Sequence, residues 1–301
     1  MVKYLCLIIP WLVVVVSVVI AIPFLTLFER KVLSYIQIRK GPNKVGFLGL
    51  LQPISDGAKL VFKEIGTPSL ANIVIFWLSP ILSFLLMIFV WGIFPFYYSS
   101  YYFILGVILF LCVSSLQVYT VLGSGWGSNS KYALIGSLRG AAQTISYEVS
   151  LIVIIFLPCC FQMSYNFFEY YSKYFFYILI FYPIFFVWFI SCLAETNRAP
   201  FDFAEGESEI VSGFNIEYAA MEFACLFLAE YGNIFFMSFI TSLFFLPASY
   251  GSIIFLGNFL AFCFVWARGS LPRFRYDFLM NMAWKIFLPF SITYLFFIFC
   301  V

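Results

Sequence analysis

The chain has 301 residues, of which 64% are hydrophobic, 23% are aromatic and only 10% are charged. Soluble domains contain roughly 25% charged residues, so this composition excludes a water-soluble globular protein and indicates an integral membrane protein. The net charge is +2, and no cluster of basic residues resembles a nucleic-acid-binding surface. We therefore expect lipid and other proteins, and no nucleic acid, as partners.

The sequence offers few ligands for a cofactor. Histidine is absent, which excludes histidine-ligated haem, histidine metal sites and histidine general-base catalysis. The eight cysteines are scattered through apolar segments without a metal-ligand spacing, and the carboxylates show no aspartate-rich metal-binding pattern. We expect no metal, haem, iron–sulfur cluster or flavin on this chain, so any electrons must be delivered by a partner.

Long apolar segments predict an all-α fold, because backbone N–H and C=O groups in lipid must be satisfied within a helix. A hydrocarbon core of about 30 Å requires about 20 residues per helix. The first span is expected to be retained, since no signal-peptide cleavage pattern follows it. Hydropathy predicts a single domain, residues 1–301, with eight spans at about 5–28, 71–97, 102–122, 140–161, 175–194, 217–243, 252–267 and 286–301.

Lysine and arginine predict the orientation of the spans. With the N-terminus outside, only Lys3 and Lys173 of the 16 basic residues fall outside, which is a strong positive-inside pattern. Both termini are therefore expected on the outer side. Nearly all polar chemistry then lies in four inner loops, predicted at 29–70, 123–139, 195–216 and 268–285.

The first inner loop contains an amphipathic segment, PISDGAKLVFKEI. Apolar residues recur with helical spacing at Ile54, Ala58, Val61 and Ile65, and charged residues fall opposite them at Asp56, Lys59 and Lys63. This pattern predicts a helix lying along the membrane surface. The alternative is a surface helix that packs on the spans and contacts no ligand.

Four carboxylates fall within predicted spans: Glu148 in the fourth, and Glu217, Glu222 and Glu230 in the sixth. A charge at the bilayer centre costs about 2.5–3.5 kcal/mol on insertion scales, so such residues are candidates for function. Desolvation disfavours the ionised form, which makes a membrane-embedded carboxyl a candidate proton carrier. The alternative for each is a hydrogen bond between helices, and for Glu222 the functional argument rests on burial alone.

The segment AETNRAPFDFAEGESEIVSG, residues 194–213, contains five of the 14 acidic residues: Glu195, Asp202, Glu205, Glu207 and Glu209. Clustered carboxylates repel one another, so such a loop responds to protonation or to a nearby charge. The commonest alternative is a solvated acidic loop. Apolar and turn residues flank the acids on both sides, which favours a folded and partly buried segment.

Four blocks of sequence resemble one family. They are ERKVLSYIQIRKGPNKVGFLGLLQPISDGAKLVFKE (29–64), GWGSNSKYALIGSLRGAAQTISYEV (125–149), AETNRAPFDFAEGESEIVSGFNIEY (194–218) and PRFRYDFLMNMAWKIFLP (272–289). In order and spacing they resemble the inner loops of NADH–ubiquinone oxidoreductase chain 1, a membrane subunit of respiratory complex I. Small departures occur: Phe203 and Ile210 stand in place of leucine, and Phe278 in place of glutamine.

The resemblance implies a subunit that is not catalytic alone and that forms part of the ubiquinone tunnel, next to peripheral-arm quinone-site and iron–sulfur subunits and neighbouring membrane subunits. Ubiquinone would be the substrate. The implied tunnel residues are Glu29, Arg30, Arg39, Asp56, Lys59, Arg139, Arg273 and Arg275. The implied proton-coupling residues are Glu148, Glu195, Asp202, Glu205, Glu207, Glu209, Glu217 and Glu230. Glu222 is outside the family pattern and inherits no role.

Two other functions compete with this hypothesis. A stand-alone proton or cation transporter would also contain intramembrane carboxylates, but the sequence shows neither the paired repeats nor the interrupted helices typical of such folds. A purely structural docking subunit would tolerate loss of those acids. The excess of Phe, Tyr and Ile over charged residues favours an organellar gene and the mitochondrial inner membrane, with the bacterial inner membrane as the alternative.

Overall fold

The computed structural model describes residues 2–96, 103–172, 181–204, 206, 213–246 and 249–300. These residues form helices and contain no β-strand, which confirms the predicted all-α fold. The long helices are α1 (Val2–Ile36), α3 (Ile73–Ile93), α4 (Gly106–Gly127), α5 (Lys131–Gln162), α9 (Ala220–Phe245) and α10 (Tyr250–Ser270). The shorter ones are α2 (Gln52–Phe62), α7 (Tyr182–Glu195), α11 (Tyr276–Asn281), the π-helical η4 (Met282–Phe287) and α12 (Leu288–Cys300). Three 3₁₀ turns, η1 (Phe47–Gly49), η2 (Phe167–Ser172) and η3 (Gly213–Asn215), lie in the connections.

Seven helical segments among the described residues are long and apolar enough to cross a membrane. They match seven of the eight predicted spans, and the last of them, Tyr276–Ile298, includes α11, η4 and most of α12. The predicted fifth span coincides with α7, which is apolar but only 14 residues long as described. Residues 173–180, where the prediction begins this span, lie outside the described residues.

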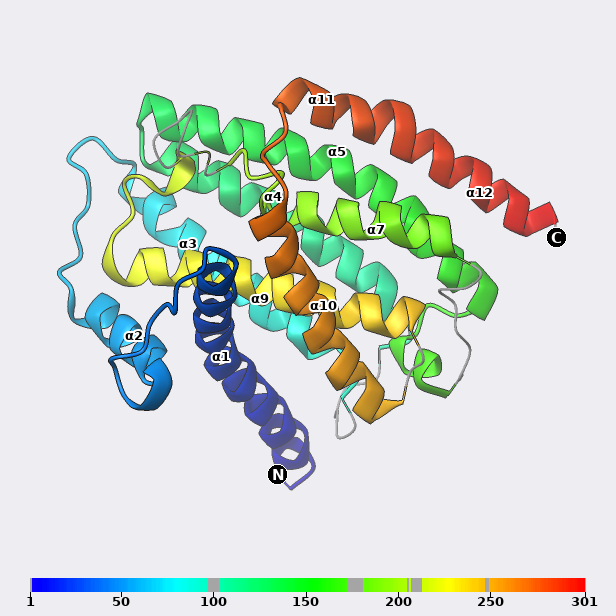
Figure 1. The fold of residues 1–301 in the computed structure, drawn as a ribbon, viewed down its shortest axis with the longest axis horizontal. Helices are drawn as coiled ribbons and strands as arrows, with labels where there is room; N and C mark the ends of the chain where they lie inside the picture. The colour runs from blue at the N-terminus through cyan, green and yellow to red at the C-terminus, as the bar shows by residue number, and fades with distance from the viewer. Residues whose placement is uncertain are drawn as a thin grey trace.

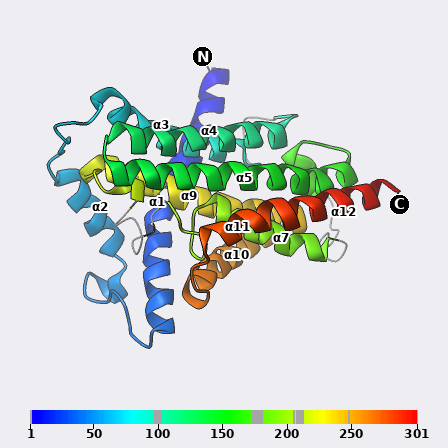
Figure 2. The same cartoon turned by 90° about the horizontal axis from the view of Figure 1, so that it is seen from above.

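The long helices form a bundle with one steeply inclined member. Figures 1 and 2 show α3, α4, α5 and α9 running lengthwise together, whereas α1 crosses their direction steeply in both views. The α11–α12 segment lies along α5, and α2 lies beside α1 at one end of the bundle (Figure 1). The end of α4 and the beginnings of α5 and α9 lie at that same end, which is the predicted inner side, whereas the short α7 ends nearer the middle of the bundle (Figure 1).

Several helices extend further than hydropathy predicted. The segment 123–139 is almost entirely helical, because α4 continues to Gly127 and α5 begins at Lys131, so the prediction of a loop there was wrong. Likewise α1 continues to Ile36, which places Glu29 and Arg30 in a helix and not in a loop. Hydropathy marks where apolar residues end, but a helix ends only where its backbone hydrogen bonding is interrupted.

The amphipathic segment of the first inner loop folds as predicted. Helix α2 begins with Pro53 in its first turn, where a missing backbone N–H costs nothing. The predicted apolar face is largely uncovered by the rest of the chain, with Ile54 61% exposed and Val61 59% exposed. An uncovered apolar face of this kind suits a helix that lies against lipid or against another subunit.

Aromatic side chains fill the centre of the bundle. Trp91 and Phe236 are almost fully buried, and their rings meet edge to face with centroids 5.5 Å apart. The Trp91 indole donates a hydrogen bond to the Gly232 carbonyl at 3.2 Å, so its polar atom is satisfied inside the core. This packing joins α3 to α9.

Glycines on α5 allow the segment after α7 to approach closely. A methyl group on Gly136 would lie 2.9 Å from the Gly213 Cα atom, and one on Gly140 would lie 2.9 Å from the Ala204 Cβ atom. The acidic segment is thus packed directly on α5 at Ala204 and at Gly213. This contact positions the polar groups described below.

We predict that Gly136→Ala lowers the thermal stability of the native protein in mild detergent. Alanine normally favours a helix over glycine by about 1 kcal/mol, but here the added methyl group meets backbone that has to move. Gly251→Ala is the matched control, because a methyl group on Gly251 would meet nothing within 4 Å. A Gly136→Ala protein as stable as the Gly251→Ala protein would contradict the close packing.

Candidate functional site

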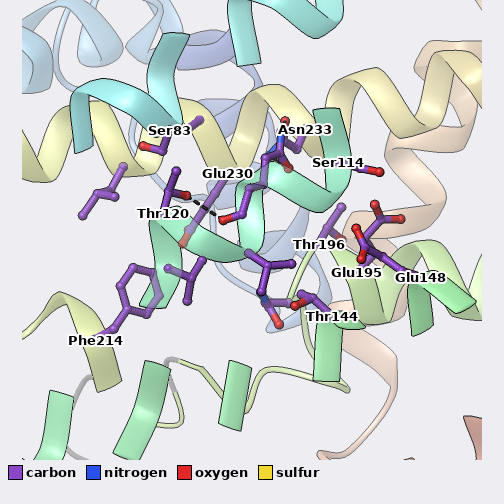
Figure 3. A pocket seen from close by; sticks show the side chains of 16 residues that line it. Ser83, Ser114, Thr120, Thr144, Glu148, Glu195, Thr196, Phe214, Glu230 and Asn233 are labelled. Atoms are coloured by element: carbon purple, nitrogen blue, oxygen red, sulfur yellow. Dashed lines mark hydrogen bonds between the residues drawn. The ribbon is translucent and has the colours of Figure 1, made fainter. Parts of the chain in front are cut away.

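Three carboxylates from different helices line one cavity in the bundle. Glu148 of α5, Glu195 at the end of α7 and Glu230 of α9 surround a cavity of about 60 Å³, and Figure 3 shows all three with Thr120 and Asn233. The structure thus brings together three of the predicted proton-coupling residues. Glu195, which the sequence placed in a loop, is the final residue of α7.

A smaller cavity of about 20 Å³ adjoins the first and shares lining residues with it, including Glu195 and Asn233. Gln117 of α4 and Asn233 of α9 exchange two amide hydrogen bonds there, at 3.1 and 2.9 Å. A buried water needs about 10–15 Å³ of such volume and two or more polar partners. The larger cavity therefore has room for a few waters, enough to bridge carboxyls that are not in direct contact.

The negative charge of Glu148 repels that of Glu195 within this cavity. One oxygen of Glu195, Oε2, is buried and has no hydrogen-bond partner in the described part of the chain. Two carboxylates that share a site disfavour simultaneous ionisation. The arrangement is suited to hold a proton on one member of the pair and to pass it to the other.

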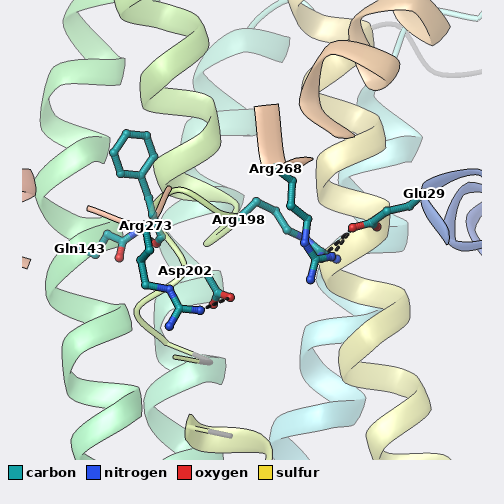
Figure 4. Close-up of polar contacts among 7 residues, drawn as sticks. Glu29, Gln143, Arg198, Asp202, Arg268 and Arg273 are labelled. Atoms are coloured by element: carbon teal, nitrogen blue, oxygen red, sulfur yellow. Dashed lines mark hydrogen bonds and ion pairs between the residues drawn. The ribbon is translucent and has the colours of Figure 1, made fainter. Parts of the chain in front are cut away.

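A second cluster of charge lies around Glu29, which is only 5% exposed. Its carboxylate accepts a hydrogen bond from Arg268 of α10, and the Arg198 guanidinium lies 3.7 Å away (Figure 4). Tyr231 of α9 also hydrogen-bonds to Glu29, and the Arg198 guanidinium lies 4.1 Å from the centre of its ring. Two arginines and a phenol thereby hold one carboxylate in the interior, as buried charges require.

Sequence reasoning assigned Glu29 but missed Arg198, Arg268 and Tyr231 as its partners. Each of these three residues is more than 160 positions from Glu29 in the chain. Pairing across such a distance leaves no periodic pattern in the sequence. The available signal was the isolation of two arginines at the inner ends of apolar segments. An arginine there needs a counter-charge, but one sequence does not say which.

Two predicted tunnel residues join α1 to α2. Arg30 Nη1 lies 2.5 Å from Asp56 Oδ2, and the Gln52 amide donates to the other Asp56 oxygen at 2.8 Å. Both members of the ion pair are partly exposed, so its contribution to stability is small. Its role is positional, since it fixes the polar face of α2 toward the end of α1. Lys59 and Arg39 are exposed.

The acidic segment is folded over residues 194–204. The Gln143 amide of α5 donates to the carbonyls of Ala194 and Phe201, at 2.7 and 2.8 Å. Phe201, Phe203 and Ala204 are buried, as expected for a packed segment and not for a solvated loop.

This segment also meets the last inner loop. Arg273 Nη2 lies 3.4 Å from Asp202 Oδ2 (Figure 4), and the Phe201 and Phe274 rings stack with centroids 5.6 Å apart. The Phe274 N–H donates to the Pro200 carbonyl at 3.2 Å. One predicted coupling residue, Asp202, is therefore in contact with one predicted tunnel residue, Arg273.

The remaining predicted residues lie at several other places in the chain. Arg139 is part-buried on α5, Glu217 is half-buried before α9, and Arg275 is 87% exposed beside Asp277 at 3.6 Å. Glu205, Glu207 and Glu209 lie outside the described residues. Their assignment to the coupling path stays a prediction.

Tyr218, next to Glu217, is anchored between two helices. Its hydroxyl lies 3.1 Å from the Ser79 hydroxyl of α3 and donates to the Ser124 carbonyl of α4 at 3.2 Å. Its ring stacks on Phe76 with a centroid separation of 4.3 Å. Burial raises the pKa of the Tyr218 phenol to about 12, so it stays protonated at physiological pH and acts only as a hydrogen-bonding group.

We predict that Arg268→Gln destabilises the folded protein, because the buried Glu29 carboxylate then keeps only Arg198 as a counter-charge. Glu29→Gln should destabilise the protein more, because it leaves both arginines without their carboxylate, and the double variant Glu29→Gln/Arg268→Gln still removes the carboxylate that Arg198 faces. Thermal unfolding in detergent of the wild type, both single variants and the double variant measures the coupling. Equal stability of the Arg268→Gln variant and the wild type would contradict the ion cluster.

Comparison with known proteins identifies the family. The sequence profile of the NADH dehydrogenase family matches residues 9–299. The NADH-ubiquinone oxidoreductase chain 1 of Aedes aegypti is 55% identical over 298 residues, covering 98% of this chain and 95% of the relative. The proteins of the same name from Locusta migratoria and Danio rerio are 51% and 49% identical, covering 95% and 92% of this chain and 93% and 89% of theirs. The chain therefore belongs to the NADH–ubiquinone oxidoreductase chain 1 family.

Proposed function

We propose that this chain is the membrane subunit of respiratory complex I that forms part of the ubiquinone tunnel and begins the path coupling quinone reduction to proton translocation. The observation that supports the proposal best is one continuous segment with a carboxylate at each end. Glu195 lines the three-carboxylate cavity, and Asp202 pairs with Arg273 at the inner side. A change of charge at the inner side is thereby transmitted along this segment to the carboxylates of the cavity.

The inner charge clusters form the quinone side of the proposal. Arginine side chains remain charged at all physiological pH values and donate several hydrogen bonds in a fixed fork, which suits them to hold carboxylates ionised beside a polar quinone head. Arg30, Arg198, Arg268 and Arg273 each pair with a carboxylate here. The quinone is the substrate, and its electrons come from the iron–sulfur subunits of the peripheral arm.

The cavity forms the proton side. Carboxyls at Glu148, Glu195 and Glu230, with room for water among them, supply groups that bind and release protons in a low-dielectric interior. When electrons reach the quinone, its negative charge attracts protons and perturbs the nearby ion pairs. Segment 194–204 is the shortest covalent route from those pairs to the cavity.

Membership of the family favours this function over a stand-alone transporter. A docking subunit without a role in coupling is the remaining alternative, and it predicts that the cavity acids are dispensable. We further propose that the protein resides in the mitochondrial inner membrane with both termini on the outer side. Its partners there are the quinone-site and iron–sulfur subunits and the adjoining membrane subunits.

We predict that Glu148→Gln and Glu230→Gln lower quinone-linked NADH oxidation and proton translocation in the assembled complex. Glutamine keeps the size and hydrogen-bonding capacity of glutamate but cannot carry the proton, and loss of a positioned acid–base group costs about 10²–10⁴ in a proton-transfer step. Glu169→Gln, an exposed carboxylate in η2 on the outer side, is the matched control. Normal turnover and pumping in both cavity variants would leave only the docking role.

We predict that a photoreactive ubiquinone analogue labels this chain within the assembled complex, near the inner-side clusters. Peptides that contain Glu29, Asp56, Arg198 or Arg273 should be modified, and excess ubiquinone should compete for the label. Mass spectrometry of the digested subunits locates the modified residues. Labelling confined to other subunits would contradict the tunnel assignment.

A further inference from the structure

Glu222 is the one buried carboxylate among the described residues that the proposed path does not use. It is the third residue of α9, close to the inner end of the helix, and it is only 5% exposed. Neither of its carboxylate oxygens has a hydrogen-bond partner in the described part of the chain. An unpaired carboxyl in the interior costs free energy, so its presence requires an account.

Glu222 lies on the face of α9 that points toward the three-carboxylate cavity. Leu226, Glu230 and Asn233 line that cavity, and residues three or four positions apart share a helix face. Glu222 is one turn before Leu226 and two turns before Glu230. At 1.5 Å per residue the separation from Glu230 along the axis is about 12 Å.

The neighbouring helices repeat this arrangement one turn apart. On α3, Ser83 lines the cavity and Ser79, four residues toward the inner side, contacts the Tyr218 hydroxyl at 3.1 Å. On α4, Thr120 lines the cavity and the Ser124 carbonyl accepts the Tyr218 hydrogen bond. Three helices therefore place polar groups on the inner side of the cavity, beside the buried side chains of Phe76 and Leu226.

Glu222 belongs with these polar groups. Its charge acts on the Tyr218 phenol and on the Cys225 thiol, which places it beside the group that joins Ser79 to Ser124. We propose that Glu222 is the proton inlet of the three-carboxylate cavity from the inner aqueous phase. This inference rests on the proposed function, and it adds a group that has no role in the family pattern.

The transfer balances without any further reactant. The Glu222 carboxylate binds one proton that arrives from the inner surface and becomes a neutral acid. It releases that proton toward Glu230, two turns further along α9, and returns to the carboxylate. One proton enters and one leaves, so the site serves repeated turnovers.

The test uses the intact complex containing the Glu222→Gln chain. We expect quinone-linked NADH oxidation and proton translocation to fall at least about tenfold, because the amide cannot take up a proton. Glu222→Asp keeps a carboxyl and should retain more than half of both rates. Electron transfer from NADH to a soluble ferricyanide acceptor, which bypasses the quinone site, should be unchanged in every variant, and native gel electrophoresis of the complex reports on assembly.

Three outcomes are distinguishable. Normal rates in Glu222→Gln with impaired Glu230→Gln would overturn the inlet and leave the proposed function standing. Normal rates in Glu222→Gln, Glu230→Gln and Glu148→Gln would overturn both. If Glu222→Gln fails to assemble, the pair Glu222→Asp and Glu222→Asn decides, since the two side chains have the same size. Failure of both amide variants to assemble would assign Glu222 a structural role and overturn the inlet.

Discussion

The side-chain amide of Gln143 donates to the carbonyls of Ala194 and Phe201, and the rest of the site depends on these two hydrogen bonds. They bind the end of α7 and the following segment to α5 at a depth where no water competes. Glu195 at one end and Asp202 at the other are thereby fixed relative to Glu148 on the same α5 helix. Without that attachment, the cavity and the inner ion pairs would belong to parts of the chain that move independently.

Burial of charge shapes both clusters, but in opposite ways. Around Glu29 one carboxylate lies between two arginines, so the cluster holds together while all its members stay ionised. In the cavity the charges are alike, and they are accommodated only when protons are present. The first arrangement fixes structure and the second responds to proton supply. Both contact α9, the cavity through Glu230 and the Glu29 cluster through Tyr231.

The sequence predicted the features that depend on local pattern. Glu148 and Glu230 stood out because lipid penalises charge, and α2 was recognisable from the spacing of Ile54 and Val61. The sequence could not predict which charged residues pair with one another. Arg268 meets Glu29 from 239 positions away, and only the packing of α10 on α1 decides that contact. Helix ends were also misjudged, as at Gly127 and Lys131, because α-helices continue past the apolar region when no residue interrupts their hydrogen bonding.

Glu230 and Tyr231 are adjacent in α9, yet they serve different clusters: Glu230 lines the three-carboxylate cavity, and Tyr231 hydrogen-bonds to Glu29. Successive residues of an α-helix point about 100° apart, with 3.6 residues per turn. The two side chains are therefore rigidly linked through one stretch of backbone. Any sliding or rotation of α9 that relaxes the Glu29 cluster displaces the Glu230 carboxyl by a similar amount, which is a mechanical coupling that needs no change of charge between the sites.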